Sequence, residues 1–569
     1  MTTLEHAFAH GYACLSARSE LLDRINVFPV ADNDTGANLR VTLAPLRSCG
    51  QDRTRLVSQI VHAAAGNSGN IAAAFFSALL QAQSCADLAE YVGKGSVLAR
   101  KSVASPQAGT MLDVFDAVAA LLSPLAVTQA TCPLLLDSLR KTVQQTSVVL
   151  PDLRSAAVVD AGALGMYLFF DGFFSSLTGC QPAAAPLKEL FPAGLEVAAT
   201  FIPVHGAEHC ITATLKAPGQ HLPEMAELQR LGDCVVAIPG EDQFRLHLHA
   251  ADPGHLRAQL DRFGQVISWA EEPMLVAGNE AAGKQKASGC VHIMTDAAGS
   301  LSSELARQHN ITLLDSFILL EDRACPETLC APELVYRLMR AGQRVTTAQS
   351  SQTERYQSYQ STCEQFGRTL YLCVGSAYTG NYNTALSWKK KHDPDDCMVV
   401  VDSGAASGKL AVIALLASRF ARTLENVDQV LAAVNRLGES CREYVFIDRL
   451  QYLVAGGRVT KAAGFFGDLF HLKPVISPGR SGVWKEGAVH THQAQVDFAL
   501  EKLETELAPN SKALVLLQYS DNQARVQDEI EPRVRQLLPQ AEILCVPLSL
   551  TSGVHMGPGT WSLAFAPVS

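Results

Sequence analysis

The chain has 569 residues, 48% hydrophobic and 18% charged, so it can bury several cores and is neither disordered nor collagenous. This length predicts roughly three or four domains, and a net charge of −10 without a long basic block argues against nucleic acid as a partner. No apolar run reaches the roughly 20 residues that cross a bilayer, so we expect no stable membrane insertion.

The 15 cysteines are odd in number and show no paired C-x-x-C spacing. This pattern favours reduced thiols over a disulfide framework or a zinc ribbon. The N-terminus also lacks a basic start followed by an apolar stretch, which would indicate a secretory signal. We therefore expect a cytoplasmic protein.

Residues 1–180 carry apolar side chains at three-to-four spacing, which predicts helices. Strand-like runs follow at 195–204, 209–217, 233–240 and 244–250, with a helix start at 251–264. The stretch 190–278 is therefore predicted as a small α+β domain. Segments 181–186 and 279–289 are predicted as linkers.

From residue 290 to 569, strand and helix patterns alternate, which predicts parallel sheets with covering helices. The apolar run 311–320 is predicted as one strand. Polar groups gather where predicted strands end, at Thr295, Thr346–Ser350, Gly375–Tyr382 and Asp402. Because ligands bind beyond the carboxyl ends of such strands, these groups are candidates to hold a carboxylate. Taken singly, each Ser or Thr is better explained as an ordinary helix cap.

Asp32 and Asp34 lie two residues apart in NVFPVADNDTGANL, residues 26–39. Two such close carboxylates repel unless a cation neutralises them, and hard oxygen ligands favour Mg²⁺. The alternative is an Asx-type turn that caps the following helix. Gly66–Gly69 precede an apolar helix, whose free N–H groups suit phosphate oxygens, but taken by itself this segment is better explained as a glycine-rich turn with a Ser or Asn cap. No P-loop motif is present.

Together with Gly109–Thr110 and VVDAGA at 158–163, these segments follow the order and spacing of a known family. Residues 1–180 resemble the nucleotide-binding domain of dihydroxyacetone-kinase L subunits and, more closely, the catalytic subunit of bacterial fatty acid kinase. The resemblance implies an all-α helical barrel that binds ATP and Mg²⁺. Two departures are Asn33, where the family has glycine, and Ala65, where it has arginine.

The resemblance also implies the roles of individual residues. Asp32 and Asp34 are expected to be catalytic and to bind the metal, with Asn26 or Asp23 as a third ligand. The expected nucleotide-binding residues are Asn38, Asn67, Ser68, Gly69, Gly109, Thr110, Asp160 and Gly162.

In the segment 245–254, His247 and His249 alternate along one strand and so share a face. The segment resembles the middle domain of the same family, in which an upstream cysteine completes a metal site. The position aligned with that cysteine holds Ala198. Two half-exposed strand histidines are therefore favoured over a transition-metal site.

Residues 290–569 resemble the DegV family of fatty-acid-binding proteins, with six motifs in the same order. The resemblance implies a two-lobed α/β fold with an apolar tunnel for an acyl chain. Thr347, Ser376 and His555 are expected to bind the acyl carboxylate, and Arg458, in a Gly-Gly-Arg motif, is expected to be catalytic. Departures include Ala297, Ala348, Gly375 and the stretch 489–494, which lacks the usual basic residues.

The sequence therefore predicts a multidomain protein that phosphorylates a bound fatty acid to an acyl phosphate with ATP. A homodimer and an acyltransferase that accepts the acyl phosphate are the further partners that the resemblance indicates. Two alternatives stay open: a lipid-binding protein without kinase activity, and a kinase for a small hydroxy-ketone such as dihydroxyacetone.

Overall fold

The structure is a computed structural model, and the chain divides into two compact units, residues 1–284 and 285–569. The residues described are 3–48, 52–122, 127–180, 185–203, 209–216, 223–240, 242–274, 289–321, 323–455, 472–508 and 511–568. Most of both predicted linkers, residues 181–184 and 279–288, lies outside this range. No helix in the described ranges is both long and apolar enough to cross a bilayer.

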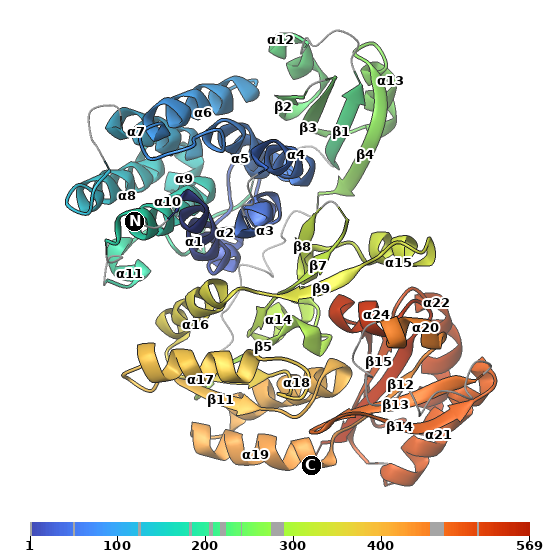
Figure 1. The fold of residues 1–569 in the computed structure, drawn as a ribbon. Coiled ribbons are helices and arrows are strands. Elements are labelled where there is room, and N and C mark those ends of the chain that lie inside the picture. The colour runs from blue at the N-terminus through green and yellow to red at the C-terminus, as the bar shows by residue number, and fades with distance from the viewer. Residues whose placement is uncertain are drawn as a thin grey trace. The chain divides into compact units, whose positions relative to one another are not determined.

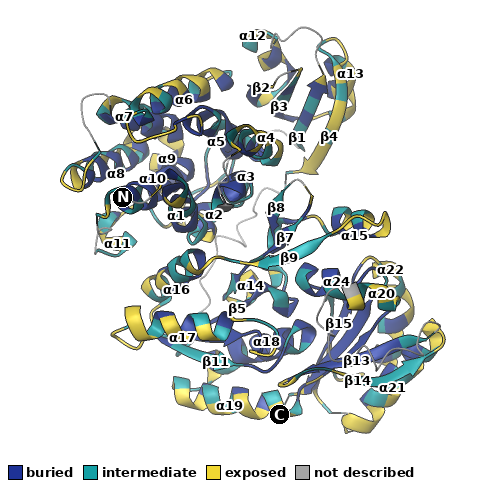
Figure 2. Cartoon of the chain, in the orientation of Figure 1, coloured by how far each residue is buried: buried dark blue, intermediate teal, exposed yellow. Residues whose placement is uncertain are grey.

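The first unit begins with helices that pack around the apolar helix α10, which is buried along most of its length (Figures 1 and 2). Helix α1 packs closely against it, because a Cβ on Gly11 would lie 2.7 Å from the Phe169 carbonyl oxygen. This arrangement confirms the predicted helical N-terminal part. Its helices are α1 (Leu4–Ser16), α2 (Ser19–Arg24), α3 (Thr35–Leu43), α4 (Arg53–Ala63), α5 (Gly66–Leu79), α6 (Leu88–Ser102), α7 (Met111–Leu122), α8 (Cys132–Val149), α9 (Pro151–Ala156), α10 (Ala161–Thr178) and α11 (Leu187–Leu190).

A four-stranded antiparallel sheet of order β2-β3-β1-β4 completes the first unit. One face is apolar and packs against α13 around Leu246 and Leu248. The strand predicted at 195–204 is wrong: residues 195–203 form no strand, and the Ala198 N–H donates to the Ala156 carbonyl at the end of a helix. The elements of this part are β1 (His209–Lys216), α12 (Met225–Leu228), β2 (Asp233–Pro239), β3 (Gln243–Ala250), α13 (Pro253–Leu260) and β4 (Gln265–Pro273).

The second unit contains two larger sheets joined by one apolar core around α18 (Figure 1). The first is parallel, of order β11-β10-β5-β6. Residues between β6 and β10 in the chain form a separate three-stranded sheet of order β8-β7-β9. The single strand predicted at 311–320 is wrong. The chain leaves the parallel sheet at Asp315, whose carboxylate accepts from the Thr328 N–H and hydroxyl, and the next strand joins the smaller sheet.

The other large sheet is six-stranded, of order β14-β13-β12-β17-β15-β16. Only β15 and β16 run parallel, so the prediction of parallel sheets holds for the first sheet and is wrong for this one. The prediction that the C-terminal half is an α/β domain of a multidomain chain is confirmed.

The helices and strands of the second unit follow in chain order: β5 (His292–Asp296), α14 (Ser303–His309), β6 (Ile311–Leu314), β7 (Ser316–Leu319), β8 (Ala324–Pro326), α15 (Pro332–Arg340), β9 (Thr346–Gln349), α16 (Gln352–Phe366), β10 (Thr369–Cys373), α17 (Asn381–His392), β11 (Met398–Asp402), α18 (Ser407–Thr423), α19 (Val427–Ser440), β12 (Arg442–Phe446), α20 (Leu450–Ala455), β13 (Lys473–Gly479), β14 (Gly482–Val489), α21 (His492–Glu506), β15 (Ala513–Tyr519), α22 (Gln523–Arg525), α23 (Glu531–Leu537), β16 (Glu542–Pro547), α24 (Leu550–Met556) and β17 (Trp561–Pro567).

Candidate functional site

A cavity of about 490 Å³ lies in the first unit, between the helices and the small sheet. Its volume is in the range of small-molecule sites, roughly 300–1,000 Å³. Most of the predicted nucleotide and metal residues of the four motifs come together around it. Those that line it are Asn26, Asp32, Asp34, Asn67, Ser68, Thr110, Asp160 and Gly162.

The loop before α3 presents two carboxylates to this cavity. Asn33 between them has a φ of 58°, the left-handed conformation that Asn tolerates where the resembled family has glycine. Asp34 is the N-cap residue of α3 but makes no side-chain cap hydrogen bond, so the capping alternative is wrong for this residue. The Asp34 carboxylate therefore does not cap the first turn of α3.

Asn26, which also lines the cavity, connects the two ends of this loop. Its amide donates to Asp32 Oδ1 at 2.5 Å, and its carbonyl oxygen accepts from the Thr35 hydroxyl at 2.9 Å. Asn26 is 3% exposed, so this short network is fixed by burial. Asp23 lies outside the cavity lining and accepts from the Ala37 N–H at 3.0 Å, which is a structural role at the start of α3.

Electrostatics favour a cation between the two carboxylates. Burial, followed by the neighbouring Asp34 charge, raises the pKa of Asp32, and burial also raises the pKa of Asp34. Two carboxylates in this position hold a proton unless a positive ion replaces it. An oxygen-only ligand set of two carboxylates and an amide suits Mg²⁺.

The second motif forms the N-terminus of α5. Ala65 is its N-cap residue and supplies no side-chain oxygen, so the first N–H groups of the helix keep no side-chain partner at that residue. Ser68 Oγ and Asn67 Oδ1 are buried at the cavity and have no hydrogen-bond partner among the described residues. Unpaired buried polar atoms beside a helix N-terminus match a site that binds phosphate oxygens.

Gly66 lets this loop approach α3. Its φ is +56°, and a Cβ there would lie 2.0 Å from Asn38 Nδ2. Gly69 approaches α3 in the same way, since its Cβ would lie 2.3 Å from Thr42 Oγ1. Asn38 and Gly69 are therefore behind the cavity wall, where they set the distance between the acidic loop and the glycine loop.

The third and fourth motifs meet at Asp160, the N-cap residue of α10. Its carboxylate accepts from the Ala163 N–H at 2.7 Å, and burial raises its pKa to about 7. It also accepts from the Met111 N–H, next to Thr110, so it positions the Gly109–Thr110 loop. Gly109 itself does not line the cavity, and its N–H donates to Asp113 Oδ2 at 2.6 Å.

The sequence did not indicate that the small sheet would form one wall of this cavity. Four consecutive residues of β2, Asp233–Val236, line it together with His249 of β3. Cys234 has a φ of 54°, at a register shift in the pairing of β2 with β3. No local motif marks these residues, because the wall depends on the docking of the sheet on the helices.

A second cluster, Cys210, His247 and His249, lies on the same polar face of the sheet. The potential ligand atoms of the three side chains lie within 4.8 Å of one another. Cys210 lies opposite His249 in the pairing of β1 with β3. Cys210 is therefore the cysteine of this cluster, in the role for which the family resemblance had aligned Ala198. The expectation of half-exposed histidines is wrong, because His247 and His249 are 0% and 3% exposed.

The unpaired atoms of this cluster fit a transition metal. Thr212 Oγ1 lies 3.1 Å from His247 Nδ1, which leaves His247 Nε2 buried with no partner among the described residues, and His249 Nδ1 is in the same condition. Burial lowers the pKa of both histidines, so both are neutral and can act as ligands. One thiolate and two imidazoles form a ligand set that zinc accepts.

In the second unit, two of the predicted carboxylate-binding residues meet. Thr347 Oγ1 on β9 lies 3.1 Å from His555 Nε2 on α24. Ser376 instead binds Asp402: its hydroxyl donates at 2.6 Å and its N–H at 3.0 Å. Arg458 lies outside the described residues.

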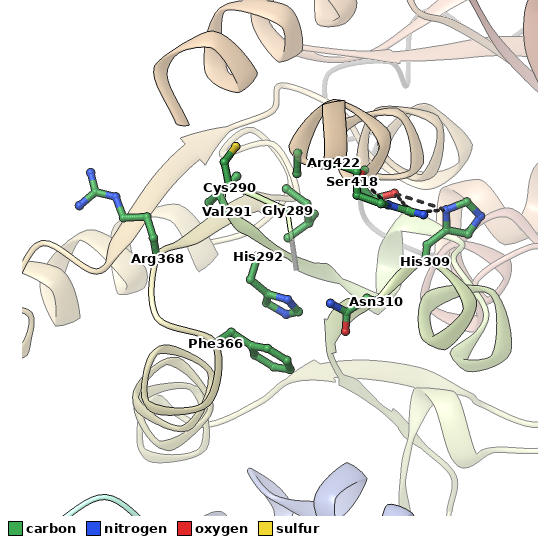
Figure 3. A pocket seen from close by; sticks show the side chains of 12 residues that line it. Gly289, Cys290, Val291, His292, His309, Asn310, Phe366, Arg368, Ser418 and Arg422 are labelled. Carbon is green, nitrogen blue, oxygen red and sulfur yellow. Dashed lines mark hydrogen bonds between the residues drawn. The ribbon is translucent and has the colours of Figure 1, made fainter. Parts of the chain in front are cut away.

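A small cavity of about 110 Å³ lies elsewhere in the second unit, lined by His292, Phe366 and Arg422 among others (Figure 3). His292 stacks on Phe366 with ring centroids 3.6 Å apart. The cavity is below the range of ligand sites, roughly 300–1,000 Å³, and none of the predicted acyl-binding residues lines it. It therefore does not correspond to the predicted acyl site.

Two family models match the chain. Residues 29–175 match the DAK2 domain, and residues 290–568 match the DegV family of uncharacterised proteins. The chain therefore joins a DAK2 domain to a DegV domain, which confirms the fusion that the motifs predicted.

Several similar proteins each match about half of this chain. A DegV domain-containing protein of Streptococcus pyogenes serotype M1 is 26% identical over 283 residues, 47% of this chain and 95% of that protein. A protein of Thermotoga maritima named fatty acid-binding protein is 25% identical over 279 residues, 48% of this chain and 95% of that protein. A solved structure of a fatty-acid-binding DegV family protein from Thermus thermophilus is 22% identical, with a TM-score of 0.45, and covers 49% of this chain and 99% of its own.

Proposed function

We propose that this protein is an acyl kinase, which transfers the γ-phosphoryl group of ATP to the carboxylate of a bound fatty acid. The observation that carries the proposal is the cavity in which the carboxylates of Asp32 and Asp34 face the N-terminus of α5. A cation site beside a phosphate site is what a Mg²⁺–nucleotide complex requires. The closed helical barrel implied by the family resemblance belongs to the same proposal.

Within the cavity, each group has a role that its position supports. Asp32, Asp34 and Asn26 would hold Mg²⁺, which would neutralise charge on the phosphates. The N–H groups at the start of α5 and the Ser68 hydroxyl would bind phosphate oxygens. Asp160 would position the loop that carries Thr110, so that the phosphates are held without movement of the backbone.

The DegV part would supply the fatty acid. The relative from Thermotoga maritima is named for fatty acid binding, and we infer the same ligand class for this half of the chain. Thr347 and His555, which lie within hydrogen-bond distance, would bind the acyl carboxylate in an apolar tunnel. Ser376 would join them only after its hydroxyl leaves Asp402.

The reaction needs no general base. A fatty acid is ionised at neutral pH, because carboxyl pKa values lie near 4, and its carboxylate is the nucleophile. One carboxylate oxygen forms a bond to the γ-phosphorus while the bond to the bridging oxygen of ADP breaks. The main barrier is repulsion between two anions, which cations reduce. Arg458 is a candidate for one of these cations. The proposal also includes two partners: a second copy of the chain in a homodimer, and an acyltransferase that accepts the acyl phosphate.

The test uses the full chain with ATP, MgCl₂ and oleate, and hydroxylamine to trap acyl phosphate as a hydroxamate. The D32N/D34N double variant should form no hydroxamate and keep its oleate affinity, because the change lies in the other unit. D137N changes a half-buried carboxylate on α8 that pairs with Arg140 and Lys141; it is the matched control and should keep activity. Retained turnover in the double variant would refute the proposed site.

The same experiment distinguishes the alternatives. A protein that binds oleate and MgATP without forming hydroxamate would be a lipid-binding protein rather than a kinase. Phosphorylation of dihydroxyacetone in place of oleate would identify a hydroxy-ketone kinase.

A further inference from the structure

We propose that Arg245, on β3 of the small sheet, is a positioning residue for the glycine loop at the start of α5. In this role its guanidinium group holds the loop from the side of the sheet. The inference rests on the proposed nucleotide-binding function and deepens it, because it makes the small sheet a working part of the nucleotide site.

The contact that carries this inference crosses from the sheet to the helices. Arg245 Nη2 donates to the carbonyl oxygen of Ala64 at 2.5 Å. Ala64 is the C-cap residue of α4 and lies two residues before Gly66, the first residue of α5. The next N–H, of Ala65, donates to Thr42 Oγ1 at 3.2 Å. The peptide between Ala64 and Ala65 is therefore held at its oxygen by the sheet and at its nitrogen by α3.

A held peptide at this position fixes the direction of the N–H groups that follow it. The N–H groups of Gly66, Asn67 and Ser68 belong to the first turn of α5, and all three residues line the cavity. Because the first turn of a helix leaves its N–H groups without intrahelical partners, their direction decides whether they meet phosphate oxygens. Arg245 thus acts on the phosphate site through Ala64.

The strand pattern explains why Arg245 points toward the helices. Alternate residues of a strand share a face, so Arg245, His247 and His249 lie on one side of β3. The opposite side carries Leu246 and Leu248, which pack in the apolar core under α13. Helix α5 contacts both β2 and β3. The polar face of the sheet is therefore the face that meets the glycine loop.

The charge of the cavity gives the guanidinium a second role. Four carboxylates line the cavity, and no lysine or arginine does so among the residues that the structure describes. Such a lining disfavours an anionic nucleotide unless cations offset it. Arg245 brings a permanent positive charge to the loop just behind this lining. The four carboxylates are those of Asp32, Asp34, Asp160 and Asp233.

Two further contacts attach the sheet on the other side of the cavity. The Ala104 N–H donates to the Val235 carbonyl at 3.1 Å, and Gln229 Nε2 donates to Ser105 Oγ at 2.6 Å. Ala104 and Ser105 both lie in the chain between α6 and the Gly109–Thr110 loop. The sheet is therefore attached to both loops that flank the nucleotide cavity, and Arg245 is the attachment at the glycine loop.

The experiment measures MgADP affinity of the full chain by calorimetric titration, so it does not depend on turnover. R245A should raise the dissociation constant at least about tenfold, because a charge-assisted hydrogen bond and a nearby positive charge are lost. R245K keeps the charge without the planar fork and should lie between wild type and R245A. R262A removes an exposed arginine of the same small sheet domain and should leave the affinity unchanged.

A fourth variant separates positioning from folding. In the double variant A65R/R245A, a guanidinium returns to the loop itself, and MgADP affinity should recover at least in part. Wild-type affinity in R245A would overturn the inference, as would a loss in R245A that neither R245K nor A65R reduces. A wild-type protein that fails to bind MgADP would instead refute the proposed function.

Discussion

The substitution of Gly66 by alanine tests the geometry of the candidate site most sharply. Gly66 adopts a φ of +56°, and an added Cβ would lie 2.0 Å from Asn38 Nδ2 and 2.7 Å from Asn38 Cγ. A left-handed residue with a Cβ costs roughly 1–2 kcal/mol. The overlap adds to this cost, because Asn38 must leave its place beside Asp34. We expect G66A to lower the free energy of unfolding by about 2–3 kcal/mol.

The same change should act on ligand binding. Because Asn38 lies between the glycine loop and the acidic loop, its displacement moves both loops together. We expect the affinity for MgADP to fall by more than about tenfold, which corresponds to 1.4 kcal/mol of binding free energy. Urea denaturation and calorimetric titration on the same samples measure the two effects.

Gly93 provides the matched control. It lies inside α6, and a Cβ there would meet nothing within 4 Å. Alanine in a helix interior is more stable than glycine by roughly 0.5–1 kcal/mol, so G93A should raise stability and leave MgADP binding unchanged. The reasoning is refuted if G66A matches wild type in both stability and MgADP affinity. It is also refuted if G93A and G66A shift the free energy of unfolding in the same direction.

Two other predictions concern buried groups. Burial raises the pKa of Glu443 to about 7, while the unfolded chain ionises near 4.5, so the folded state holds an extra proton between these values. Glu443 should therefore contribute a fall of about 3 kcal/mol in the free energy of unfolding as pH rises from 4.5 to 7, at 1.36 kcal/mol per unit, and E443Q should lessen the pH dependence of urea denaturation by this amount. A pH dependence in E443Q equal to that of wild type would show that Glu443 does not contribute to it. We expect wild type to bind zinc at the Cys210 cluster and C210S to lose it, measured by elemental analysis after dialysis, whereas C85S, at an exposed thiol, should keep it; equal zinc in both variants would contradict the cluster.

Local patterns predicted the parts of the site that are contiguous in sequence. The acidic loop, the glycine loop and the segment around Asp160 each carry their turn chemistry within a few residues. The structure brings these segments to one cavity. The positive φ at Asn33 also agrees with the glycine of the resembled family.

The parts that the sequence did not predict depend on tertiary contacts. Cys210 joins His249 only because β1 and β3 pair in a particular register, and a one-residue slip would turn Cys210 to the other face. The run 311–320 has the composition of one strand, because strand propensity does not depend on which sheet a residue joins. The chain changes sheets at Asp315, and this follows from the bonds to Thr328. The wall formed by β2 likewise depends on how the sheet docks on the helices.

One measurement tests the central claim directly, namely ³¹P NMR of the purified full chain with oleate, ATP and MgCl₂. The account predicts that ADP and an acyl phosphate resonance appear in equal amounts and that both disappear when oleate is omitted. The claim would be contradicted if ADP accumulated without acyl phosphate in a buffer that contains no hydroxylamine. It would also be contradicted if both ligands bound and no phosphoryl group were transferred.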